Sequence, residues 1–218
     1  MAVVLAGADR LTLDVYAITE AGRLRAHARR TVALTRASWP ALHEAVRPLV
    51  ALARARGAAR VAIALRTSLK GGPWIRRAKD DARRLRCELL RLSAADELRW
   101  LFLGGIRETR AQDGVVAELE RDGIALARFR GRVLAAAARI GLGDEPAESG
   151  VALGGHAGAL VVSGSLANEG RPRGPAAAAL KRLRRWTRND APVIARDALA
   201  AGLAATLLRA PVPDAEAR

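Results

Sequence analysis

The sequence predicts an α/β protein built from two similar halves, and three observations support this prediction. Half of the 218 residues are hydrophobic and 27% are charged, which is the balance of a globular protein. Short apolar runs typical of strands alternate with longer segments of helical periodicity. The same order of predicted elements occurs twice, at a spacing of about 110 residues, which indicates an internal duplication.

The first half opens with three predicted strands in a meander, at residues 2–6, 11–18 and 23–32. A helix follows that begins near Ser38, has Pro40 in its first turn and ends at Gly57. The remaining elements are a strand at 60–65, a helix at 73–86, a strand at 87–92 and a helix at 94–103 with Ser93 as its N-cap. This order, β-β-β-α-β-α-β-α, is that of the ribonuclease-H-like fold.

The second half predicts a shortened copy of this arrangement. Its strands are expected at 115–120, 123–130, 132–139, 159–162 and 191–195. Its helices are expected at 175–186 and, with Asp197 as the cap, up to about residue 208. Residues 141–158 are rich in Gly, Pro and Ala and predict a loop. We expect ribonuclease-H-like subdomains at 1–112 and 113–210 and a tail at 211–218. Two such subdomains facing each other across a cleft resemble the actin-like ATPase architecture.

The charge of the chain is strongly positive, at +15, and it has two interpretations. Only three of the 37 basic residues are lysines, and this excess of arginine, with abundant Ala and Gly, is also what codon bias in a G+C-rich genome produces. Alternatively, the charge indicates a polyanionic partner, because arginine binds phosphate in a bidentate way. Both interpretations remain open at this stage.

Several classes of protein are excluded or disfavoured by the sequence. No apolar run reaches the length of a membrane span, and no signal peptide is recognisable, so no membrane partner is expected. The single cysteine, Cys87, cannot form an internal disulfide and favours a reducing compartment, so we expect a cytoplasmic protein. His27, His43 and His156 are widely separated and have no partner at zinc-ligand spacing.

One stretch of the first half resembles a known family. The strand that ends in Thr67-Ser68, the helix after it and the run Ser93-Ala-Ala-Asp96-Glu97-Leu-Arg-Trp-Leu-Phe-Leu-Gly104 are similar to the exopolyphosphatase / guanosine pentaphosphate phosphatase family (Ppx/GppA). The resemblance covers roughly residues 2–128. It implies that Glu97 is the general base of a phosphoanhydride hydrolase that acts on polyphosphate or a phosphorylated nucleotide, with Mg²⁺ if the protein is catalytic.

The resemblance also implies which residues contact phosphate. Gly7 and Asp9 occupy the first phosphate loop, and Thr67, Ser68 and Lys70 follow the strand at 60–65. Asp9 is the one Mg²⁺ ligand that this arrangement offers. An ordinary polar turn explains Thr67 and Ser68 equally well. In the second half, Ser163-Gly164-Ser165 lies between a buried strand and a helix, where it is the best candidate for a further phosphate loop, although it has too few glycines for a P-loop.

Both phosphate loops of the family are degenerate in this chain. The aspartate that begins the first loop of the family is replaced by Leu5, which cannot hold a metal ion or orient water. The Gly-rich second loop is replaced by Ala117-Glu-Leu-Glu-Arg-Asp122-Gly123, where acids repel phosphate. Glu97 has a second interpretation, because a carboxylate in the first turn of a helix capped by Ser93 stabilises that turn. Whether the protein is an enzyme is therefore left open.

Two basic runs are candidate polyanion contacts. They are represented by Arg76, Lys79 and Arg83 in the first half and by Lys181, Arg184 and Arg185 in the second half. Solvated helix faces are the alternative explanation. Two functional hypotheses follow: a phosphatase-like protein that binds polyphosphate or a phosphorylated nucleotide with catalysis reduced or lost, or a non-catalytic basic protein that binds nucleic acid or a protein partner. A ribonuclease-H-type nuclease ranks last, because Leu5 stands where a carboxylate is needed.

Overall fold

The fold is known from a computed structural model, which describes residues 1–7, 10–20, 23–34, 39–67, 69, 74–121, 123–146, 149–151, 158–164, 166, 174–195 and 197–209. The side chains of residues 39 and 74–77 lie outside this description. Every structural statement below concerns the described part of the chain.

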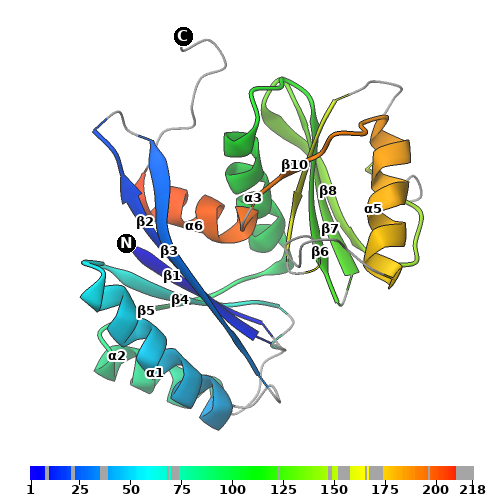
Figure 1. The fold of residues 1–218 in the computed structure, drawn as a ribbon. Coiled ribbons are helices and arrows are strands. Elements are labelled where there is room, and N and C mark those ends of the chain that lie inside the picture. The colour runs from blue at the N-terminus through cyan, green and yellow to red at the C-terminus, as the bar shows by residue number, and fades with distance from the viewer. Residues whose placement is uncertain are drawn as a thin grey trace. The chain divides into compact units, whose positions relative to one another are not determined.

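The first sheet has five strands in the order β3-β2-β1-β4-β5 (Figure 1). They are β1 (Ala2–Ala6), β2 (Arg10–Ile18), β3 (Leu24–Ala33), β4 (Val61–Leu65) and β5 (Glu88–Arg91). The first three pair antiparallel, whereas β4 is parallel to β1 and β5 is parallel to β4. The helices α1 (Trp39–Ala55) and α2 (Trp74–Arg84) provide the crossover connections that parallel strands need.

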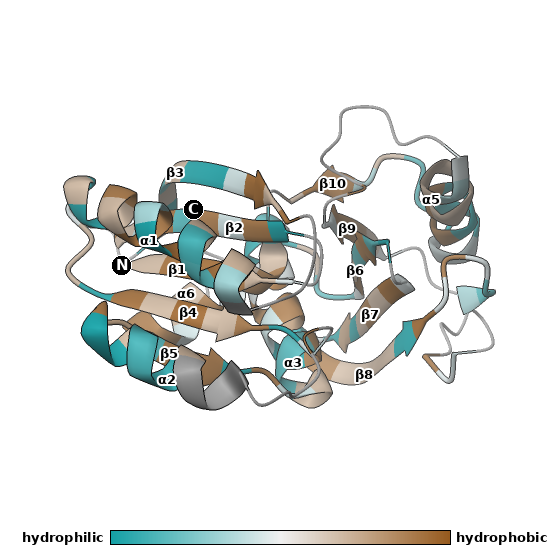
Figure 2. Ribbon diagram, turned by 90° about the horizontal axis from the view of Figure 1, so that it is seen from below, coloured by the Kyte–Doolittle hydropathy of each residue, from teal (hydrophilic) through white to brown (hydrophobic). Residues whose placement is uncertain are grey.

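The core of this sheet follows from side-chain alternation. Ala2, Val4 and Ala6 point to one face of β1, and the apolar side chains of α1 and α2 cover them. Figure 2 shows the central strands β1 and β4 in apolar colours, whereas β3 at the edge and α2 are largely hydrophilic.

The second sheet repeats the topology of the first, with the order β10-β9-β6-β7-β8. Its strands are β6 (Gly114–Glu120), β7 (Gly123–Arg130), β8 (Val133–Ile140), β9 (Ala159–Ser163) and β10 (Val193–Ile194). The helix α5 (Gly174–Thr187) packs on one face, against Val115, Ala117 and Leu119. The other face contacts α3 (Ala94–Gly105), the 3-10 turn η1 (Ile106–Glu108) and the beginning of α6 (Ala198–Leu208).

The chain divides into two compact units, and each is described by itself. The first comprises Met1–Glu97 and the last turns of α6, from Ala204 onward, and the second comprises Leu98–Leu203. The chain thus passes from one unit to the other within α3 and again within α6. The boundary expected after residue 112 stays a prediction.

The predicted fold class is confirmed: the protein is an α/β protein with two subdomains whose sheets share one strand order. Every predicted strand and helix is present. The end of α3 differs, because the helix continues through Gly104 and Gly105, where a stop was expected. A Cβ on Gly104 would lie 1.7 Å from the carbonyl oxygen of Ala198, so this glycine serves the contact with α6 rather than ending the helix.

Candidate functional site

The carboxyl ends of β1 and β4 bring two of the predicted site residues to one edge of the first sheet. Ala6 pairs with Leu65 in the parallel register, and the amide of Arg66 donates to the carbonyl of Ala6 at 2.9 Å. Gly7 and Thr67 follow these paired ends directly. Ligands bind at this edge in open α/β sheets, so the sequence-based expectation for Gly7 and Thr67 is compatible with the topology.

Glu97 lies at the same place, and its carboxylate is bound by the end of β4. The residue is 1% exposed. Its Oε1 accepts hydrogen bonds from the amide of Thr67 at 2.5 Å and from the Thr67 hydroxyl at 2.8 Å. Its Oε2 lies 3.4 Å from Nη2 of Arg66, whose side chain is 11% exposed. The structure therefore joins Glu97 and Thr67, although they lie 30 residues apart in the sequence.

The capping interpretation of Glu97 is wrong, because its neighbour Asp96 fills that role. The amide of Asp96 donates to Oγ of Ser93 at 3.1 Å, and the amide and hydroxyl of Ser93 donate to Oδ2 of Asp96 at 3.1 and 2.7 Å. This is a reciprocal capping box with Asp at the third helical position. The carboxylate of Glu97 is thus directed at β4 instead of at its own helix.

The hydrogen bonds and the ion pair of the Glu97 carboxylate limit the chemistry that it can perform. A general base needs a carboxylate oxygen within reach of the water that it deprotonates. Here one oxygen accepts two hydrogen bonds from Thr67 and the other faces a guanidinium. In this arrangement Glu97 holds the end of β4 against the first turn of α3.

The two segments that correspond to phosphate loops lie in the β1–β2 and β6–β7 hairpins. The amide of Gly7 donates to the carbonyl of Arg10 at 2.9 Å, so it is engaged within the β1–β2 connection. The β6–β7 hairpin is short, because Glu120 pairs with Gly123. Gly123 has a φ of +142°, and a Cβ there would lie 2.4 Å from the carbonyl of Ile140. The conformation of Gly123 therefore serves a close contact with the end of β8.

In the second unit, Ser163 and Gly164 have structural contacts. Ser163 is fully buried, and its Oγ accepts a hydrogen bond from the amide of Ala198 at 2.9 Å, at the first turn of α6. Asp197 completes this cap by accepting from Ala200, as the sequence predicted. Gly164 has a φ of +97°, and a Cβ on it would lie 2.4 Å from the carbonyl of Leu119.

The candidate polyanion contacts differ in whether they form ion pairs with described residues. Lys79, Lys181 and Arg184 form no ion pair with a described residue, whereas Arg83 lies 3.5 Å from Asp80 and Arg185 lies 3.5 Å from Glu145. Several candidate site residues lie outside the described part of the chain. Among the phosphate contacts these are Asp9, Ser68, Lys70 and Ser165, and among the polyanion contacts it is the side chain of Arg76.

Two residues of this region were not singled out in the sequence. Arg66 is the cation beside Glu97, and its signal was a basic residue directly after a fully buried strand. Asp14 on β2 is 2% exposed, and its Oδ1 lies 3.9 Å from Nε of Arg29. An acid between the apolar residues Leu13 and Val15 was the available signal for Asp14.

The described residues do not fit the Mg²⁺ ion that the resemblance in the sequence implies. No three Asp, Glu, His or Cys side chains gather among them. The buried carboxylates of the first unit each lie beside an arginine, Asp14 beside Arg29 and Glu97 beside Arg66, and the positive charge of the guanidinium disfavours a cation at the same carboxylate. No described helix combines the length and hydropathy needed to cross a membrane.

Comparison with known proteins relates this chain to others by fold. No protein-family model matches the sequence, and no curated protein matches it significantly. Among solved structures, a Ppx/GppA family member from Aquifex aeolicus has 9% sequence identity and a TM-score of 0.72, over 95% of this chain and 97% of that chain. An exopolyphosphatase-like protein has 10% identity and a TM-score of 0.69, over 93% and 95% of the two chains.

A third structure widens the group. The ethanolamine utilization protein EutJ from Carboxydothermus hydrogenoformans has 13% identity and a TM-score of 0.52, over 98% of this chain and 88% of its own. The resemblance to Ppx/GppA proteins that the first half of the sequence suggested therefore extends, as a likeness of structure, over nearly the whole chain. The chain has the two-subdomain α/β fold of the Ppx/GppA proteins, at a sequence identity that shows the fold alone.

Proposed function

We propose that this protein binds a phosphate-rich ligand, polyphosphate or a phosphorylated nucleotide, and that its phosphatase chemistry is reduced or lost. The observation that carries the proposal is the state of Glu97. A carboxylate that accepts two hydrogen bonds from Thr67 and faces Arg66 holds the end of β4 in place. Because both of its oxygens are engaged, it is poorly placed to deprotonate a water molecule.

Binding is supported by charge and fold rather than by a complete site. The chain carries +15, and Lys79, Lys181 and Arg184 have no ion-pair partner among the described residues. Without the Gly-rich cradle, affinity would come from these cations and would fall steeply as salt is raised. We expect the protein to act in the cytoplasm, where Cys87 stays reduced.

The experiment measures binding and turnover together. Tripolyphosphate and guanosine pentaphosphate are titrated by calorimetry at about 50 and 200 mM salt. Phosphate release is then followed with Mg²⁺ present. We expect salt-sensitive binding that falls at least threefold in the double variant Lys181→Ala/Arg184→Ala, with little or no phosphate release. The matched control is Arg91→Ala, which removes an exposed cation that has no ion-pair partner among the described residues.

The variant Glu97→Gln distinguishes a structural role of Glu97, as the contact that holds β4, from a role as general base. Rapid phosphate release by the wild type that Glu97→Gln abolishes, with the variant still folded by circular dichroism, would show that the phosphatase chemistry persists and would overturn the loss of catalysis. Absence of binding to both ligands at low salt would overturn the proposal as a whole.

The second candidate is a non-catalytic protein that binds nucleic acid. It is favoured by two exposed cations of α5, Lys181 and Arg185, whose spacing of four residues places them on one helical face. Tighter binding of single-stranded DNA than of tripolyphosphate, lost in Lys181→Ala/Arg184→Ala, would select this candidate.

A further inference from the structure

The outer strand of the first sheet, β3, carries several cations and no acid. Its ten residues include Arg25, Arg29, Arg30 and His27, and seven of them are exposed. In the described part of the chain β3 pairs with β2 alone, so its other edge faces away from the sheet (Figure 1). An edge of this length presents main-chain donors and acceptors that another strand can use.

The hydrogen-bond alternation identifies which groups face outward. Gly7 donates to Arg10 and Tyr16 donates to Met1, so the main chain of even-numbered β2 residues turns toward β1. The odd-numbered residues Leu11 and Leu13 then turn toward β3, where their partners are Val32 and Arg30. The amides of Arg29 and Thr31 therefore point to the open edge.

The charge on this edge selects the kind of strand that can pair with it. Arg29 lies beside Asp14, but Arg25 and Arg30 have no ion-pair partner among the described residues. Two copies of β3 would bring like charges opposite each other, which is unfavourable. A strand rich in Asp and Glu would instead be attracted and would place its carboxylates opposite the arginines.

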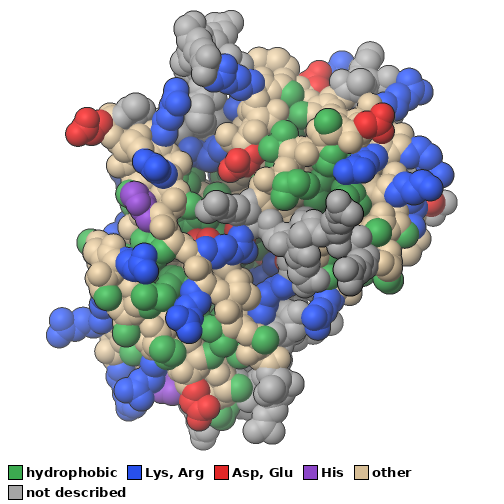
Figure 3. All heavy atoms as spheres, viewed as in Figure 1, with side chains coloured by type: hydrophobic (Ala, Val, Ile, Leu, Met, Phe, Trp, Pro, Cys, Tyr) green, Lys and Arg blue, Asp and Glu red, His purple; other side chains and the backbone are tan. Residues whose placement is uncertain are grey.

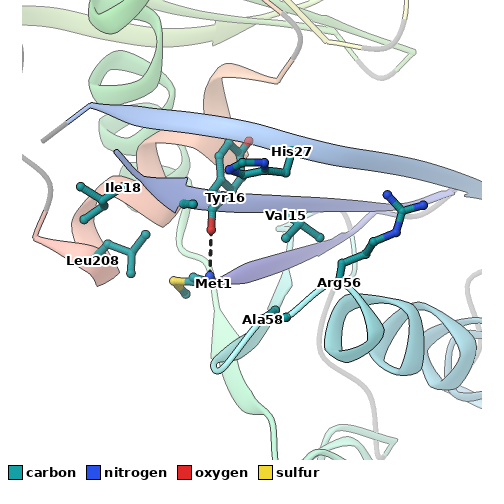
Figure 4. A pocket seen from close by; sticks show the side chains of 10 residues that line it. Met1, Val15, Tyr16, Ile18, His27, Arg56, Ala58 and Leu208 are labelled. Atoms are coloured by element: carbon teal, nitrogen blue, oxygen red, sulfur yellow. Dashed lines mark hydrogen bonds between the residues drawn. The ribbon is translucent and has the colours of Figure 1, made fainter. Parts of the chain in front are cut away.

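β3 is irregular at His27, and this residue also lines a cavity whose other walls come from β2, the end of α1 and α6. Tyr16 pairs with Ala26 and Val15 with Ala28, so His27 is the extra residue of a β-bulge. Beside the bulge lies a cavity of about 330 Å³. Figure 4 shows Ile18 and Leu208 on one side of it and Arg56 on the other, with His27 near Tyr16. Ile18 is 41% exposed, so an apolar side chain can contact it from outside.

We propose that an extended acidic segment of a partner protein adds to β3 as a further strand and places an apolar side chain in the cavity at the bulge. Main-chain hydrogen bonds would supply affinity, and the arginines and the cavity would supply specificity. A single-stranded nucleic acid fits less well, because β3 has no Phe, Tyr or Trp on which bases could stack. This proposal is independent of phosphate binding and of Glu97.

The test uses the full chain and a fluorescent peptide of about eight residues in which Glu alternates with Val. We expect it to bind, and we expect a peptide with Lys in place of Glu not to bind. The double variant Arg25→Glu/Arg30→Glu should weaken binding of the acidic peptide at least tenfold. The matched control Arg86→Glu/Arg91→Glu changes the charge equally at two exposed arginines of the same unit and should leave binding within twofold.

A second pair of variants tests the main-chain contacts. Thr31→Pro removes one outward amide without removing a ladder hydrogen bond to β2, a position where edge strands accept proline. It should abolish peptide binding, whereas Thr31→Ala should retain it, with unchanged far-ultraviolet circular dichroism in both. Binding that survives Thr31→Pro or the charge reversal at Arg25 and Arg30 would overturn the proposal. Tighter binding of oligo-dT that disappears in the same variants would also overturn it, in favour of a nucleic-acid edge.

Discussion

Asp96 and Glu97 are adjacent acids in the first turn of α3, yet they contact different parts of the molecule. Asp96 closes the capping box with Ser93 and is half-buried, whereas Glu97 is buried and binds Thr67 and Arg66. Neighbouring helical positions point about 100° apart, so one faces its own helix end and the other faces the sheet. At the scale of single residues, the contacts of Glu97 thus connect α3 to the end of β4.

Replacing Glu97 with Gln should destabilise the protein. The change removes the negative charge that faces Arg66, whose side chain is 11% exposed, and weakens the acceptor of two Thr67 hydrogen bonds, at a cost of about 2–3 kcal/mol. The free energy of unfolding in urea measures this cost. The control is Glu88→Gln, whose pair with Arg60 is exposed and is worth about 0.5 kcal/mol. An equal loss in the free energy of unfolding in the two variants would contradict a structural role of Glu97 at the end of β4.

Cys87 should make the free energy of unfolding fall at alkaline pH. Burial raises the pKa of the Cys87 thiol, and the nearby Arg54 cation offsets this only in part. The folded state therefore keeps the proton at a pH where the unfolded state releases it. This contribution to stability is fully present below the unfolded thiol pKa of about 8.5 and is lost as the pH rises through the folded pKa.

Urea unfolding at pH 7 and at about pH 9.5 measures this dependence. The free energy of unfolding should fall less over this interval in Cys87→Ala than in the wild type. An identical fall in both proteins would contradict the assignment to Cys87.

At the scale of elements, several helix ends use one backbone motif with different residues. After α1, Gly57 has a φ of +80°, and the amides of Gly57 and Ala58 donate back to Arg54 and Ala53. The end of α5 has the same bonds, from Arg188 to Arg185 and from Asn189 to Arg184. This is the Schellman motif, in which glycine avoids the strain of a positive φ.

Arg188→Gly should therefore stabilise the protein. Arg188 has a φ of +52° and is exposed, so the change relieves backbone strain without removing a packed side chain. We expect a gain of about 0.5–1 kcal/mol in the free energy of unfolding. Arg185→Gly, inside the same helix, should lose about 1 kcal/mol. A loss in both variants would show that the side chain of Arg188 contributes more than its conformation costs.

The contact of α3 with α6 depends on glycine at both helices. A Cβ on Gly202 would lie 1.8 Å from the carbonyl oxygen of Trp100, and Gly104 makes the reciprocal approach to Ala198. Gly202→Ala should therefore lose at least about 2 kcal/mol, although alanine favours a helix by about 1 kcal/mol over glycine. Thermal unfolding measures the change. Gly143→Ala, which meets no atom within 4 Å, is the control, and a stabilised Gly202→Ala would contradict the tight contact.

At the scale of the whole molecule, charge is the dominant property. Figure 3 shows Lys and Arg side chains spread over this face of both units, with few acids among them. The chain carries 37 basic and 22 acidic residues, so repulsion acts throughout the folded state. Several surface cations remain without an ion pair, which leaves the repulsion uncompensated.

Raising the salt concentration should therefore raise stability. Between about 20 and 200 mM NaCl the screening length falls to below 10 Å, so repulsion between surface arginines weakens. We expect the thermal midpoint to rise by a few degrees, which corresponds to about 1 kcal/mol. KCl should have the same effect, since the cause is ionic strength. A midpoint that falls with salt would mean that surface ion pairs outweigh the repulsion.

The sequence by itself determined the order of the elements and the topology class, because hydrophobic periodicity, turn residues and caps such as Ser93 and Asp197 act within a few residues. Tertiary structure alone decided that Glu97 binds Thr67, that Ser163 caps α6 from 35 residues away and that Gly104 continues a helix instead of ending it. These outcomes depend on which distant groups meet after the sheets form. A pattern along the chain contains no signal for such encounters, because a carboxylate or a glycine is compatible with several partners until packing selects one.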